Sequence, residues 1–152
     1  MITAEEFFNQ LDLLNHRIEM ALEKIQIYKS MTEKVTMSLE GEQVSHSRNL
    51  TSFEDSVIRL TEAKEYAEAL TVRYCELVNF ITEQMYKLTD LDDIQILTYR
   101  FLKHRTIMET AEDLHQCRAS VVKKTAKALK KLNTYLADFD VQQFSVHLSN
   151  TS

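Results

Sequence analysis

Residues 88–132 read LTDLDDIQILTYRFLKHRTIMETAEDLHQCRASVVKKTAKALKKL, and this stretch decides the fold. Apolar residues recur in it at the spacing with which two helices and the short turn between them pack on one core. They are Ala111, Leu114, Cys117, Val121, Ala128, Leu129 and Leu132. The spacing predicts a helix-turn-helix, in which the first residues hold a positioning helix and the last ones seat the helix that follows the turn.

The second helix of this pair, from residues 117–120 to Leu136, is predicted to have two contrasting faces. At about 100° per residue, Ser120 and five lysines fall within about a third of the circumference, opposite the apolar residues. The lysines are Lys123, Lys124, Lys127, Lys130 and Lys131. Like charges at i, i+4 cost a few tenths of a kcal/mol, and residues 114–136 contain six basic residues and no acid to offset that cost. The pattern favours contact with a polyanion over an ordinary solvated face.

Composition predicts an all-α protein, because 152 residues with one glycine and no proline lack the turn residues of a sheet. The net charge of -5 is unevenly divided. Residues 1–88 hold 9 Lys+Arg and 15 Asp+Glu, whereas residues 89–152 hold 9 and 8. The acidity therefore belongs to the N-terminal part and does not oppose binding of a polyanion by the other part.

The chain is expected to be cytoplasmic and to have no membrane partner. It contains no apolar run of about 18 residues, the length that a spanning helix needs. Its first residues, MITAEEFFNQ, carry acids where a signal peptide has a basic region and an apolar core.

Residues 1–88 are predicted to form an antiparallel, coiled-coil-like hairpin of two long helices. The first runs from Thr3, which forms a capping box with Glu6, to Met37, and the loop covers residues 38–52. The second is expected to start with a capping box of Ser52 and Asp55, and its apolar stripe includes Val57, Leu60, Ala67, Tyr74, Val78, Ile81, Met85 and Leu88. Two helices leave apolar surface uncovered, so we expect packing on the C-terminal domain or a homodimer.

The helix-turn-helix domain is assigned to residues 89–136. A helix is predicted to start at residues 89–93, where acids suit the positive end of the helix dipole, and to continue through Leu102. Thr106, with Glu109 three residues on, is predicted to cap the positioning helix. Residues 137–152 are polar and are expected to form a frayed tail.

Residues 88–132 resemble region four of bacterial sigma factors, through the Leu88/Leu91 entry, the ILTYRFL helix and the apolar spacing given above. The whole chain is similar to the ArpU/RinA-type transcriptional regulators of phages and prophages of Gram-positive bacteria. The resemblance implies a sequence-specific regulator that binds double-stranded DNA and contacts host RNA polymerase or a second protomer. The chain has nothing that resembles the promoter-melting part of a complete sigma factor, so we do not expect it to open promoters by itself. His115 stands where the family commonly has glycine, and Cys117 where it commonly has a serine or threonine cap.

The candidate DNA-contacting residues combine the lysine face with basic residues near its start and beside the positioning helix. They are Arg118, Ser120, Lys123, Lys124, Lys127, Lys130, Lys131, Lys103 and Arg105. Arg118 is expected to touch backbone phosphate rather than bases. Lys130 and Lys131 are equally explained as cations that favour the C-terminal end of their helix.

No catalytic residue, metal or cofactor is predicted. The five histidines lack metal-ligand spacing, and no glycine-rich loop is present to bind a nucleotide. Cys75 and Cys117 have no C-x-x-C spacing and are interpreted as core or near-core residues. Two alternative functions stay open: a small-terminase-like protein that recognises DNA for packaging, and a protein-interaction module that binds RNA polymerase without DNA.

Overall fold

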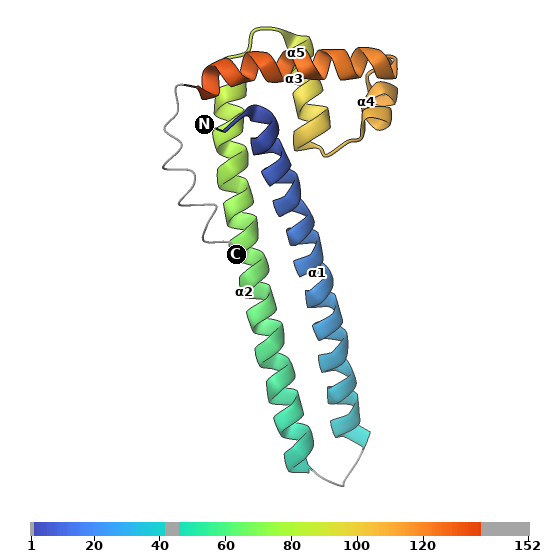
Figure 1. Cartoon of the computed structure of the whole chain (residues 1–152). Helices are drawn as coiled ribbons and strands as arrows, with labels where there is room; N and C mark the ends of the chain where they lie inside the picture. The colour runs from blue at the N-terminus through green and yellow to red at the C-terminus, as the bar shows by residue number, and fades with distance from the viewer. Residues whose placement is uncertain (1, 42–45, 138–152) are drawn as a thin grey trace. The chain divides into compact units, whose positions relative to one another are not determined.

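The computed structural model describes residues 2–41 and 46–137, and in this part of the chain it is helical without any strand. The predicted all-α class is confirmed. Figure 1 shows the elements, which are α1 (Ala4–Gly41), α2 (His46–Met85), α3 (Leu91–Leu97), the π-helix η1 (Thr98–Leu102), α4 (Ile107–Asp113) and α5 (Arg118–Leu136). Among the described residues, no helix combines the length and the apolar character that crossing a membrane requires.

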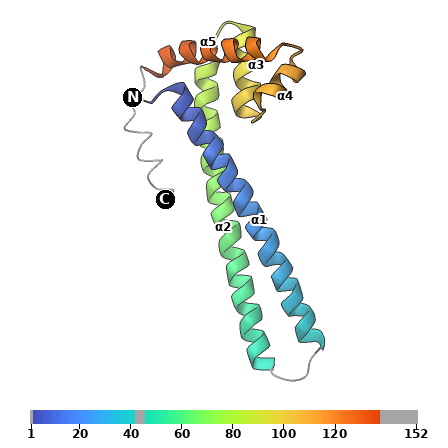
Figure 2. The same ribbon diagram turned by 45° about the vertical axis from the view of Figure 1, so that its right-hand side comes forward.

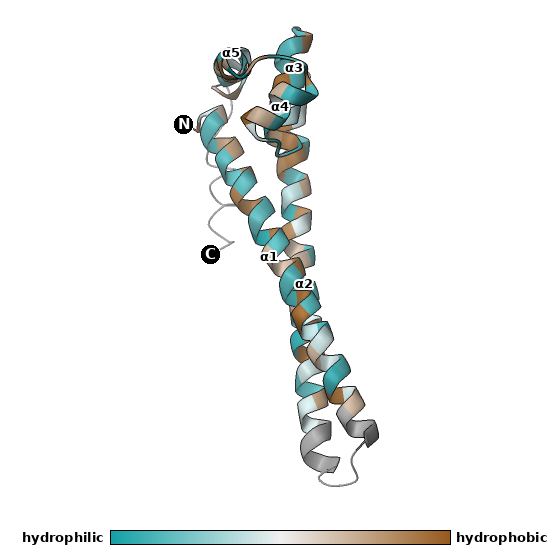
Figure 3. Cartoon of the chain, turned by 90° about the vertical axis from the view of Figure 1, so that its right-hand side faces the viewer, coloured by the Kyte–Doolittle hydropathy of each residue, from teal (hydrophilic) through white to brown (hydrophobic). Residues whose placement is uncertain are grey.

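The contacts divide the chain into two compact units. Of the described residues, those within 14–75 form one unit, and residues 2–13 together with 76–137 form the other. In the first unit α1 and α2 run antiparallel, side by side (Figures 1 and 2). The buried side chains between them are mostly small: Leu14, Ala21, Ala63, Ala67 and Leu70. In Figure 3, hydrophilic and hydrophobic residues alternate along both helices, the pattern of a helix with one covered side.

The predicted loop over residues 38–52 is wrong at both of its ends. α1 continues to Gly41 and α2 begins at His46, so between these two helices only residues 42–45 lie outside the described part. Ser52 lies inside α2, where its carbonyl oxygen accepts a hydrogen bond of 2.8 Å from the Ser56 hydroxyl, and the capping box with Asp55 does not form. Once a helix has started, each added residue gains a hydrogen bond, which outweighs the weak helix propensity of short polar residues.

Val57 is a second departure, because it is exposed rather than part of the covered stripe. The covered side of α2 follows Leu60, Ala63, Ala67 and Leu70, which recur at spacings of three and four. At about 100° per residue, Val57 lies about 120° from Ala63 around the helix axis, outside that side.

In the other unit, the start of α1 and the end of α2 share a core with the C-terminal helices. Phe8 is buried and stacks on Phe101 of η1, with ring centroids 4.4 Å apart and ring planes 8° apart. The backbone N–H of Ala4 donates to Asn133 Oδ1 of α5 at 2.6 Å. This grouping differs from the predicted boundary between residues 88 and 89, because Phe8 of α1 packs on Phe101, which lies 93 residues later.

Local start and stop signals agree with the structure at several helix ends. The capping boxes of Thr3 with Glu6 and of Thr106 with Glu109 are both confirmed. α5 ends at Leu136 as predicted, and the predicted frayed tail lies outside the described residues from 138 onward. The predicted helix through Leu102 changes its form at Thr98, where η1 begins.

Candidate nucleic-acid interface

α4 and α5 are joined by a tight turn with left-handed backbone at its centre. His115 has φ of 54°, and the following N–H of Gln116 donates to the carbonyl of Ala111 at 2.9 Å. A residue in this conformation after a helix end is usually glycine, because a Cβ is crowded there. His115 therefore takes up a backbone conformation that is more usual for glycine.

Of the seven apolar residues that predicted the turn, four are buried, two are half-buried and one is exposed. Val121, Ala128 and Leu132 have no exposed surface, Ala111 is buried, and Leu114 and Leu129 are half-buried. Cys117 is exposed, and so is Cys75, which makes the interpretation of both thiols as core or near-core residues wrong. Cys117 is the N-cap of α5, a residue that stands half outside the helix, and its side chain makes no capping hydrogen bond.

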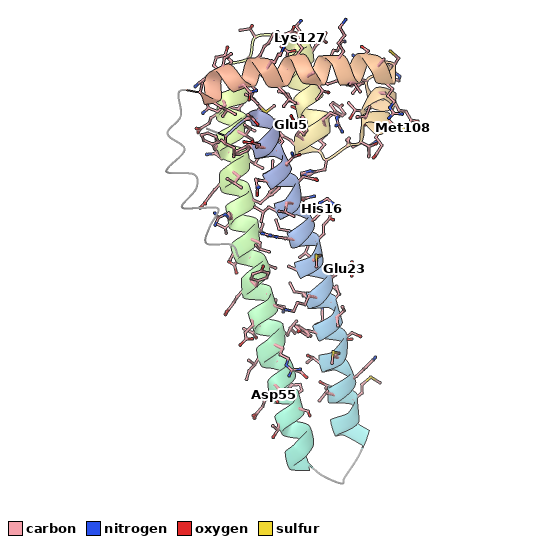
Figure 4. The ribbon with its side chains drawn as sticks, viewed as in Figure 1. Glu5, His16, Glu23, Asp55, Met108 and Lys127 are labelled. Atoms are coloured by element: carbon pink, nitrogen blue, oxygen red, sulfur yellow. The ribbon has the colours of Figure 1, made fainter. Side chains whose placement is uncertain are left out.

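The exposed side of α5 presents three of the five predicted lysines, Lys123, Lys127 and Lys130. The small residues Ala119 and Ala126 are exposed beside them. Figure 4 shows Lys127 on the side of α5 opposite Glu5 at the start of α1. Arg118 at the first turn is exposed as well, and Ser120 is half-buried. Most of the predicted basic face is therefore open to a ligand.

The other two lysines face acids, which makes the expectation of an unopposed lysine face wrong for this part of it. Lys131 Nζ donates to Asp93 Oδ2 at 2.6 Å and lies 3.8 Å from Asp90 Oδ2. Lys124 Nζ lies 3.6 Å from Asp92 Oδ2. All three acids belong to the start of α3, where Asp90 is the N-cap.

Asp93 is buried, with 3% of its surface exposed, whereas the side chain of Lys131 is about 42% exposed. The hydrogen bond from Lys131 to Asp93 raises the pKa of the lysine, as do the charges of Asp93 and Asp90, against a lowering by burial. Lys131 thus neutralises a carboxylate that would otherwise be buried without a counter-charge. Lys131 therefore serves to stabilise the fold through its contact with Asp93.

The basic residues beside α4 are also engaged within the chain. Arg105 Nε donates to Asp113 Oδ2 at 2.9 Å and pairs with Glu109, and the Asp113 hydrogen bond chiefly raises the pKa of Arg105. Lys103 Nζ lies 4.1 Å from the centroid of the Tyr99 ring, a cation–π contact. These two predicted site residues are therefore held near α4 by partners on their own unit.

Arg100 is partly buried, and the sequence gives no sign of this burial or of its hydrogen bond within the chain. Its Nη1 donates to the carbonyl of Arg105 at 3.1 Å, and burial lowers the pKa of its guanidinium. With Glu5 and Lys130 it lines a groove of about 360 Å³ beside α5. The acids at the start of α3 are the other feature that was missed. In the sequence these acids indicate only a match to the positive end of the helix dipole.

Comparisons with protein-family models, with curated proteins and with solved structures find no match to this chain. Within the residues that the structure describes, no cluster of histidine, cysteine and carboxylate side chains could hold a metal ion. The candidate interface is a helix that follows a tight turn and has an open basic side flanked by short side chains.

Proposed function

We propose that this chain is a sequence-specific DNA-binding regulator of transcription that inserts α5 into the major groove of duplex DNA. The observation that carries the proposal is the exposed basic side of α5, formed by Lys123, Lys127 and Lys130, directly after a tight turn that follows α4. A helix placed in this way is the reading element of helix-turn-helix proteins, in which the preceding helix crosses the phosphate backbone.

The contacts of the candidate residues suggest a division of roles. Arg118, Lys123, Lys127 and Lys130 are exposed and supply the phosphate contacts. Lys124 is paired with the exposed Asp92 at 3.6 Å, an ion pair weak enough to exchange for a phosphate. Lys131 stays on Asp93 and supports the helix from behind.

The short side chains at the start of α5 provide for base recognition. Ala119 is exposed and Ser120 half-buried, so neither would hold the helix away from the floor of the groove. A serine hydroxyl pairs with either donors or acceptors on base edges, and an alanine methyl contacts the methyl group of thymine. The role in phage or prophage transcription is supported by the resemblance of residues 88–132 to sigma region four, and it includes a contact with host RNA polymerase.

The test is the salt dependence of binding to duplex DNA, measured by fluorescence anisotropy. Four phosphate contacts correspond to a slope of log K against log[salt] of about -3.6. The variant K123A/K127A removes two phosphate contacts, so it is expected to reduce the magnitude of the slope by about 1.8. It should also weaken binding to all sequences. The control K29A/K64A removes the same charge from two exposed lysines of residues 14–75 and should leave the slope unchanged.

Binding that is flat in salt, or equally weakened by K123A/K127A and the control, would refute the assignment of the interface. Specificity is tested separately by selection from random duplexes, which should enrich one motif. A protein that co-purifies with RNA polymerase yet binds no duplex at low salt would be an interaction module instead, and a closed ring of many subunits would indicate DNA packaging.

A further inference from the structure

The hairpin of residues 14–75 leaves a row of apolar side chains uncovered. On α1, Met20 is 71% exposed, Ile27 57% and Met31 46%. On α2, Ile58 is 54% exposed and Tyr66 53%. Single exposed apolar residues are ordinary on a surface, but a contiguous set on adjacent helices marks an interaction site.

A shallow groove of about 220 Å³ marks one side of the hairpin, and helical geometry places the exposed apolar residues on that side. The groove is lined by Lys24 and Tyr28 of α1 and by Arg59, Glu62, Ala63 and Tyr66 of α2. At about 100° per residue, Met20, Ile27 and Met31 lie within about 60° of Lys24 around α1. Ile58 lies within about 40° of Glu62 around α2. We call this side the groove face.

The two halves of the groove face differ in charge. The α1 half carries Lys24, with Arg17 and Lys34 beside the same apolar residues. The α2 half carries Asp55 and Glu62, partly offset by Arg59. Each half therefore combines exposed apolar side chains with a charge of opposite sign to that of the other half.

We propose that the groove face is the dimer interface of this protein and that its partner is a second copy of the chain. A two-fold axis parallel to the helices lays α1 of each copy along α2 of the other, which makes a four-helix bundle. Lys24 then meets the acids of the opposite copy, and Met31 meets Ile58. The other two-fold arrangement lays α1 on α1 and places basic half against basic half, so the charges select the first.

The poor core of the isolated hairpin supports the same conclusion. The side chains buried between α1 and α2 are chiefly alanines, while Ile18, Ile25 and Leu60 are only half-buried. Two helices with so little buried apolar area gain little free energy from packing on each other. A second hairpin on the groove face adds the larger apolar side chains to a common core.

The experiment measures the mass of the full chain by light scattering and its dissociation by sedimentation over a dilution series, without DNA. The wild-type chain is expected to have the mass of two chains. Ile27→Glu places a charge in the interface and should weaken the dimer by about 100-fold. Leu22→Glu is the matched control, because Leu22 is 51% exposed on the same helix but lies about 160° from Lys24 around its axis. Circular dichroism checks that both variants remain helical.

A charge exchange tests the pairing of the two helices. Lys24→Glu should weaken the dimer by about tenfold, because it faces the acids of α2 in the other copy, and adding Glu62→Lys should restore most of the loss. A monomeric wild-type chain overturns the proposal, and so does a Leu22→Glu variant that dissociates as readily as Ile27→Glu. Failure of the exchange to restore the dimer overturns the pairing of α1 with α2. None of these outcomes depends on whether the chain binds DNA.

Discussion

The ammonium group of Lys131 donates a hydrogen bond of 2.6 Å to the buried carboxylate of Asp93, and this pair ties α5 to the start of α3. Lysines 123, 127 and 130 lie on the exposed side of the same helix, so α5 carries two kinds of lysine. One kind supports the helix and the other is open to a ligand. The distinction depends on the acids of an element 38 residues away.

Lys131→Met should destabilise the fold, because it leaves Asp93 buried without its counter-charge. The folded pKa of Lys131 is raised above its ordinary value of 10.5, so the ion pair contributes fully below pH 10.5. The contribution is lost as the pH rises through the raised pKa. Urea unfolding at a series of pH values should show that the difference in unfolding free energy between the wild type and the variant shrinks once the pH exceeds the raised pKa of Lys131. Lys130→Met, which removes the same charge one residue away, should change the unfolding free energy little. Equal effects of the two variants would contradict the structural role.

Cys117→Ser should stabilise the protein, since a serine hydroxyl at an N-cap accepts a hydrogen bond that the thiol does not form here. We expect a gain of about 0.5–1 kcal/mol in the free energy of unfolding by urea. Cys75→Ser is the control, because Cys75 is exposed within α2, and its effect should stay within about 0.5 kcal/mol. A destabilised Cys117→Ser variant would show that the thiol makes a contribution other than capping.

His115→Gly should raise the free energy of unfolding by up to about 1 kcal/mol, because glycine adopts a φ of 54° without crowding of a Cβ. His115→Val should lower it, since a β-branched residue fits left-handed backbone poorly. His104 has the same φ, but its Nδ1 lies 3.2 Å from Asp12 Oδ1. His104→Gly therefore loses this contact and should gain less. Thermal unfolding of the three variants measures the order.

Phe8→Ala should destabilise the unit that contains α4 and α5 by about 3–5 kcal/mol, although Phe8 lies more than 90 residues from these helices in sequence. The ring is 2% exposed and stacks on Phe101, so its removal leaves a cavity. Leu13→Ala, at an exposed position of the same helix, should cost less than about 1 kcal/mol. If amide exchange in α5 stays unchanged in Phe8→Ala, the start of α1 is not part of that core.

The helix positions of the C-terminal half could be predicted because their signals are local. Thr106 and Glu109 form a capping box within one turn, and the apolar spacing of Val121, Ala128 and Leu132 describes a single buried side. The loop at 38–52 was predicted too long, because short polar residues weaken a helix by too little to stop it.

The partners of the basic residues could not be predicted, because they depend on tertiary contacts. Nothing in the neighbourhood of Lys131 or Lys124 in sequence indicates an acid, yet the packing of α3 on α5 places Asp93 and Asp92 beside them. The same holds for Phe8, whose partner ring lies 93 residues away. A charge pattern on one helix thus predicts the polarity of a face but not which of its members are already paired.

The π-helix between α3 and α4 has a consequence for the comparison of this chain with others. The N–H of Lys103 donates to the carbonyl of Thr98, five residues back, at 2.9 Å, so the turn holds one residue more than an α-helical turn. A protein with a regular α-helix here would need one residue fewer between the start of α3 and the start of α4. Any alignment that allows no gap between Thr98 and Leu102 would set α4 and α5 one position out of step and pair the lysines of α5 with the wrong residues.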